Sequence, residues 1–116
     1  MAPPSEHVLD VKTKSDFQSL LSSNRLLVLQ ATASWCGPCK AISPLYNKHA
    51  TTHADKPVRF LRFDIDEDPE LCQELGIRSV PAFFFFEDGA KVHSVVGAVP
   101  PSLEKGITDL VAKVLE

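Results

Sequence analysis

Trp35-Cys36-Gly37-Pro38-Cys39-Lys40 stands between a mostly apolar run at residues 26–32 and a segment whose apolar residues recur at helical spacing. This order predicts that a buried strand leads into a helix at the cysteines. Pro38 fits the first turn of that helix, because its φ is fixed and it has no backbone N–H to donate. Cys36 would then lie at the helix N-terminus, where unpaired N–H groups and the helix macrodipole stabilise a thiolate and lower the pKa of the thiol. We therefore predict that Cys36 is a nucleophile and that Cys39, one turn later, attacks a mixed disulfide formed at Cys36.

The same two cysteines are also compatible with half of a zinc site, or with simple burial. A structural zinc needs four ligands, usually from two such pairs, and the only other cysteine is the isolated Cys72. A Cys-X-X-Cys beside a strand–helix–strand pattern is more typical of redox chemistry in a cytosolic protein, so we predict no metal and no cofactor. Cys72 is expected to be a small buried hydrophobe, the alternative being a regulatory or intermolecular disulfide. His49 and His53 are expected to be surface residues that compensate the helix dipole rather than a metal pair.

The composition is typical of one globular domain. The chain has 116 residues, is 44% hydrophobic and has a net charge of −3, so we expect a single domain over residues 1–116 with a mobile N-terminus at 1–6. Residues 1–7 lack the basic and apolar regions of a secretory signal, and the densest apolar stretch, residues 80–86, is shorter than the about 20 residues that span a bilayer. Basic residues are scattered, which argues against nucleic acid as a partner. Three cysteines are too few for a disulfide scaffold, and we expect a cytoplasmic protein that does not bind a membrane.

The hydrophobic pattern predicts alternating strands and helices. Ser15 with Gln18 is a capping-box sequence for the first helix, and Asp68 followed by Pro69 predicts the start of the third. Helical crossovers join parallel strands, whereas the short Asp-Gly link after residue 87 makes the last two strands antiparallel. The expected strands are 7–11, 26–32, 58–65, 82–86 and 91–96, and the expected helices are 15–24, 39–53, 69–76 and 103–114. The predicted fold is α/β, with a central mixed five-stranded sheet flanked by four helices in the order βαβαβαββα.

The sequence at residues 35–39, Trp-Cys-Gly-Pro-Cys, resembles the active site of the thioredoxin family. The resemblance extends from the first predicted strand to the last predicted helix. Residues 76–81, Gly-Ile-Arg-Ser-Val-Pro, are similar to the family segment whose proline is cis and faces the dithiol, and Gly89 and Gly97 match family glycines in the hairpin and at the end of the last strand. The resemblance therefore implies a thioredoxin fold with a cis bond at Val80-Pro81.

The resemblance also implies a function. The protein would be a monomeric thiol–disulfide oxidoreductase that reduces protein disulfides, an electron carrier in cell redox homeostasis. A disulfide between Cys36 and Cys39 would be its only redox group, and a thioredoxin reductase would restore the dithiol. Extended protein segments would dock by backbone hydrogen bonds, as in strand addition, on an apolar patch formed by Trp35, Gly37, Pro38, Val80, Pro81, Gly97 and Ala98. Trp35 is equally compatible with core packing. The alternative is a binding or regulatory subunit that uses the same patch without redox turnover.

One position departs from the family pattern. The family commonly carries a buried Asp six residues before its first cysteine, where it is thought to relay a proton for the resolving cysteine; this chain has Gln30 there. Glutamine cannot titrate. The family's nearby Lys corresponds to Arg62, so the ion pair expected between the two positions is absent. The usual proton path is therefore in question here, although the redox chemistry is not.

Overall fold

The computed structural model describes residues 6–115, so the predicted mobile segment 1–6 lies, apart from Glu6, outside the described residues. The observed element order is the predicted βαβαβαββα. The strands are β1 (Val8–Asp10), β2 (Leu26–Thr32), β3 (Val58–Asp64), β4 (Ala82–Glu87) and β5 (Ala90–Val96). The helices are α1 (Lys14–Ser23), α2 (Gly37–Thr52), α3 (Pro69–Glu74) and α4 (Pro100–Ala112), followed by a 3-10 turn, η1 (Lys113–Leu115).

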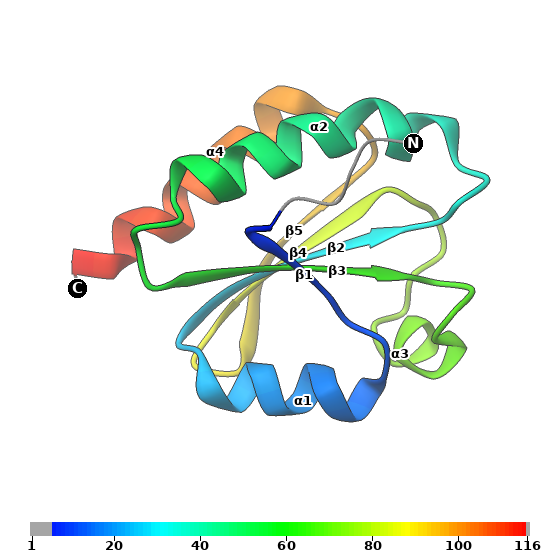
Figure 1. Cartoon of the computed structure of the whole chain (residues 1–116), viewed down its shortest axis with the longest axis horizontal. Helices are drawn as coiled ribbons and strands as arrows, with labels where there is room; N and C mark the ends of the chain where they lie inside the picture. The colour runs from blue at the N-terminus through cyan, green and yellow to red at the C-terminus, as the bar shows by residue number, and fades with distance from the viewer. Residues whose placement is uncertain (1–5, 116) are drawn as a thin grey trace.

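The five strands form one mixed sheet in the order β1-β3-β2-β4-β5, which confirms the predicted fold class. The pairs β1–β3 and β2–β3 are parallel, whereas β2–β4 and β4–β5 are antiparallel. Helices α2 and α4 cover one face of the sheet, and α1 and α3 lie on the other (Figure 1). This sandwich explains why the central strand β2 is apolar over most of its length, because both of its faces are covered.

Three helices begin earlier than the expected ranges: α2 begins at Gly37, and the starts of α1 and α4 also differ. The cap of α1 is Thr13 and not Ser15: Thr13 has extended backbone angles, and its Oγ1 accepts from the Asp16 N–H at 3.0 Å. Ser15 lies inside the first turn, where it cannot act as the half-in residue of a cap. Helix α4 begins at Pro100 rather than residue 103, because a first turn tolerates prolines that have no N–H to donate. The predicted cap of α3 is confirmed, since Asp68 Oδ1 accepts from the Leu71 N–H at 3.1 Å.

The core consists of two clusters, one on each face of the sheet. The cluster under α2 and α4 includes Tyr46, which is fully buried. Its hydroxyl donates to the Leu61 carbonyl at 2.7 Å and lies 3.2 Å from the Val28 carbonyl oxygen, so it fastens α2 to β3 and β2. Burial raises the pKa of Tyr46 well above its usual value, so the hydroxyl stays protonated. Within residues 6–115, no helix is both long and apolar enough to cross a membrane.

Candidate active site

Cys36 and Cys39 lie where β2 passes into α2, as predicted. Cys36 is the residue that caps α2, and its backbone N–H donates to the Ala33 carbonyl at 3.1 Å. Its Sγ accepts from the Cys39 backbone N–H at 3.1 Å, so the sulfur occupies the place of a capping side chain. The two cysteines form a disulfide, with their Cα atoms 5.3 Å apart. The first turn of the helix therefore directs the Cys39 N–H, and the positive end of the helix macrodipole, at the sulfur of Cys36.

Both cysteines are closely packed. Cys36 is 4% exposed and Cys39 is 1% exposed, and they contact a small cluster with Ala33, Ile65 and Val80. The Cys36 Sγ lies 3.6 Å from the carbonyl oxygen of Val80. A disulfide partner must therefore approach Cys36 between the start of α2 and the backbone of Val80.

The segment opposite the disulfide has the geometry that the resemblance implied. The Val80–Pro81 peptide bond is cis. The Pro81 carbonyl accepts from the Gly97 N–H at 2.8 Å, which links the end of β5 to this segment. Gly97 has a φ of 99°, in the region that favours glycine. These contacts bring Val80, Pro81 and Gly97 together beside Cys36.

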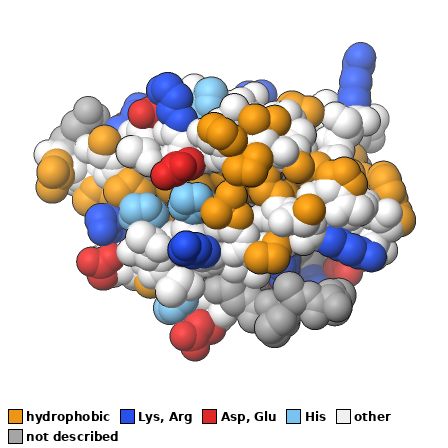
Figure 2. All heavy atoms as spheres, turned by 90° about the horizontal axis from the view of Figure 1, so that it is seen from above, with side chains coloured by type: hydrophobic (Ala, Val, Ile, Leu, Met, Phe, Trp, Pro, Cys, Tyr) orange, Lys and Arg blue, Asp and Glu red, His pale blue; other side chains and the backbone are white. Residues whose placement is uncertain are grey.

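The predicted docking patch is only partly at the surface. Trp35 is 67% exposed, so it is not a core residue, and its indole Nε1 donates to the Asp66 carboxylate at 2.8 Å. Gly37, Pro38 and Ala98 are exposed, Val80 and Gly97 are half-buried, and Pro81 is buried. Two exposed residues that the sequence analysis missed, Val96 and Val99, flank Gly97 and Ala98. Figure 2 shows hydrophobic side chains that gather from the middle of the α2 and α4 face towards the end where α2 begins.

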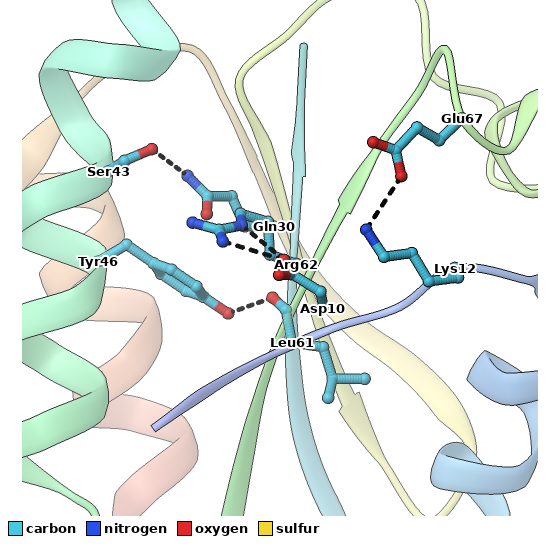
Figure 3. Close-up of polar contacts among 8 residues, drawn as sticks. All are labelled: Asp10, Lys12, Gln30, Ser43, Tyr46, Leu61, Arg62 and Glu67. Carbon is cyan, nitrogen blue, oxygen red and sulfur yellow. Dashed lines mark hydrogen bonds and ion pairs between the residues drawn. The ribbon is translucent and has the colours of Figure 1, made fainter. Parts of the chain in front are cut away.

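Gln30 is fully buried beneath α2. Its Nε2 donates to Ser43 Oγ at 3.1 Å, and Ser43 Oγ donates to the Cys39 carbonyl at 2.7 Å. Arg62, its neighbour in register on β3, pairs with Asp10: Nε and Nη2 each lie 3.0 Å from Asp10 Oδ1 (Figure 3). The ion partner of Arg62 is therefore a residue of β1. No periodic pattern pointed to Ser43 or Asp10, because the Gln30–Ser43 and Arg62–Asp10 contacts join separate elements.

The remaining candidates show no comparable arrangement. Cys72 is half-buried, and burial, followed by the charge of Asp66, raises the pKa of its thiol, which opposes thiolate formation. His49 and His53 are half-buried, and burial lowers the pKa of each, which opposes the charged form that the expected compensation of the helix dipole needs. Within residues 6–115, no three His, Cys, Asp or Glu side chains are grouped so that they could hold a metal ion.

Comparisons with known proteins agree with this geometry. The thioredoxin family model matches residues 8–109. Thioredoxin Asp f 29 of Aspergillus fumigatus is 48% identical over 86 residues, which are 74% of this chain and 78% of that protein. Thioredoxin-1 of Schizosaccharomyces pombe is 37% identical over 100 residues, 86% of this chain and 95% of that protein. The crystal structure of Malassezia sympodialis thioredoxin superposes with a TM-score of 0.85 at 38% identity, covering 90% of this chain and 93% of that one.

The family model covers most of the chain and includes the cysteine pair at the start of α2. Together with these relatives, the disulfide-forming pair identifies the activity as thiol–disulfide exchange, the reduction of protein disulfides. The chain therefore belongs to the thioredoxin family.

Proposed function

We propose that Cys36 is the nucleophile that attacks a substrate disulfide and that Cys39 resolves the mixed disulfide. One observation carries this assignment: Cys36 Sγ takes the place of a capping side chain at the start of α2 and accepts from the Cys39 N–H, where an anion is stabilised. Cys39 lies one turn inside the helix and is the less exposed of the two. In the reduced protein the thiolate should therefore form first at Cys36.

Brief alkylation of the reduced protein tests the assignment. We expect iodoacetamide to label Cys36 well before Cys39 and before Cys72, whose thiol pKa is raised. Mass mapping of the modified peptides measures the order. Preferential labelling of Cys39 would show that the roles are reversed.

We further propose that the substrates are disulfide-containing proteins that dock as extended segments on the patch around Trp35. The exposed Trp35, Val96 and Val99 and the half-buried Val80 support an apolar surface beside Cys36. Backbone groups near the Val80 carbonyl would add hydrogen bonds, as in strand addition. A Cys39→Ser variant should retain such substrates as mixed disulfides, and peptide mapping of the retained proteins identifies the segment bound.

A thioredoxin reductase is the proposed source of electrons, and the cytoplasm is the proposed location, since a reducing compartment suits a dithiol that must cycle. A monomer is the proposed solution state. Coupled turnover with purified reductase, cell fractionation and light scattering test these three points in turn.

The exposed patch would also serve a protein that binds partners without redox turnover. The insulin-reduction assay separates the two functions: Cys36→Ser should abolish reduction, whereas Cys72→Ser should leave it unchanged. A Cys36→Ser protein that kept its full biological role would favour the binding function.

A further inference from the structure

Ser43 makes a hydrogen bond at a weak point of α2. Its hydroxyl donates to the Cys39 carbonyl at 2.7 Å, four residues back. The next residue, Pro44, has no N–H, so the Lys40 carbonyl lacks its usual donor inside the helix. A residue before proline is also disfavoured in the helical conformation. The Ser43 hydroxyl therefore supplies a second contact to the turn that carries Cys39, where the regular ladder is interrupted.

Gln30, on β2, donates a hydrogen bond to the Ser43 hydroxyl from the sheet beneath α2. The amide Nε2 of this fully buried side chain donates to Ser43 Oγ at 3.1 Å, so the hydroxyl hydrogen is left to point at the Cys39 carbonyl. The other amide atom, Oε1, is buried without a hydrogen-bond partner among residues 6–115. In Figure 3 the Gln30 amide nitrogen is directed at Ser43, and the register of β2 and β3 puts Arg62 beside Gln30. Polar groups thus form a row from Asp10 at the sheet edge, through Arg62 and Gln30, to Ser43 and the Cys39 turn.

We propose that Gln30 and Ser43 are positioning residues for the second half of the exchange reaction, an inference that rests on the proposed roles of Cys36 and Cys39. Ser43 fixes the turn that carries Cys39, and Gln30 orients Ser43. Because neither side chain titrates near neutral pH, they act by holding Cys39 in line with the Cys36 sulfur and not by taking its proton.

Disulfide exchange at this site takes two steps. The Cys36 thiolate attacks a substrate disulfide, a Cys36–substrate bond forms, and one substrate thiolate leaves. The Cys39 thiol then loses its proton to solvent and its sulfur attacks Cys36 Sγ. The Cys36–Cys39 bond forms and the second substrate thiolate leaves, so the protein is oxidised by two electrons and the substrate disulfide is reduced.

Stopped-flow reduction of dithiobis(nitrobenzoate), an aromatic disulfide with coloured thiolates, separates the two halves. The first thiolate reports attack by Cys36 and the second reports resolution by Cys39; a Cys72→Ser background removes the third thiol. We expect Ser43→Ala to slow release of the second thiolate by about 3- to 10-fold, well below the ~100-fold that a 1 Å misplacement can cost. Release of the first thiolate should be unchanged. Ser43→Thr, which restores a hydroxyl, should recover the rate.

Gln30→Leu, which removes the amide at similar volume, should slow the same phase, and combining it with Ser43→Ala should add little, because both act through one contact. Ser23→Ala is the matched control, since Ser23 makes the same 2.7 Å bond to the carbonyl four residues back in α1, far from the cysteines. The proposal would be overturned if Ser43→Ala released the second thiolate at the wild-type rate. It would also be overturned if both phases slowed equally, or if Ser43→Thr did not recover the rate. If mass mapping shows that the first thiolate is released at Cys39, the proposed roles of the cysteines fail, whatever the Ser43 variants do.

Discussion

The two faces of the sheet are built differently. Under α1 and α3 the core cluster includes Leu29, Leu61 and Phe63, and the buried carboxylate on this side, Asp68, lies at the start of α3 as its cap. Under α2 and α4 an apolar cluster around Tyr46 and Phe83 gives way, at the end of β2 near the cysteines, to the buried amide of Gln30 and the Arg62–Asp10 pair. Packing is therefore continuous on one face and interrupted by polar groups where α2 carries the reactive pair. One face mainly stabilises the fold, whereas the other combines stability with positioning of the cysteines.

Truncation on the apolar face should have the largest effect on stability. Leu29 is fully buried in the cluster beneath α1 and α3. We expect Leu29→Ala to lower the free energy of unfolding by about 2 to 5 kcal/mol, from lost burial and the cavity left behind. Urea denaturation measures the change, with Leu9→Ala, at a 40% exposed position on β1, as a control that should change little. A loss below ~1 kcal/mol for Leu29→Ala would show that this face repacks readily. That result would contradict the view that this face mainly stabilises the fold.

A charge placed at Gln30 should have the next largest effect. Gln30→Glu adds a carboxyl with almost no change in volume, and burial would raise its pKa above the unfolded value of about 4.3. Such a group destabilises the folded protein as pH rises above that unfolded value, because the unfolded chain then ionises more readily than the folded one. We expect a loss of about 1 to 3 kcal/mol at neutral pH and little loss at pH ~4. Urea titrations at both pH values measure it. A pH-independent loss would indicate that Arg62, the neighbour in register, compensates the new charge.

The fold was predictable because the signals for its strands and helices lie close together along the chain. The apolar run 26–32, the Asp68-Pro69 cap and the Asp-Gly turn are local patterns, and each predicted element is present with bounds that differ by at most three residues. Thr13 was missed because Thr13 and Ser15 both have a suitable residue three positions later, and only the backbone angles of Thr13 decide between them.

Contacts of the site between separate elements could not be predicted in this way. Trp35 meets Asp66 across 31 residues, and Gln30 meets Ser43 across 13 residues. A polar pair of this kind leaves no periodicity in the sequence. The cysteine pair itself was predictable, because its chemistry depends on adjacent residues and on one helix end.

The smallest expected effect is a pH dependence of stability at the far end of α2. Burial is the main cause that lowers the pKa of His49 and of His53; the charge of Glu104 opposes it at His49, and Asp55 opposes it at His53, where Lys56 and His49 add to the lowering. As pH falls below the unfolded value of about 6.5, the unfolded chain takes up protons before the folded protein does, so stability declines from that pH towards the lower folded pKa values and is constant above it. His49→Gln with His53→Gln should flatten this decline. Urea midpoints between pH ~7.5 and ~5 measure the slope. A slope unchanged in the double variant would show that these histidines do not cause the acid sensitivity. The carboxyl introduced by Gln30→Glu would then be the titrating group on the α2 face that changes stability most.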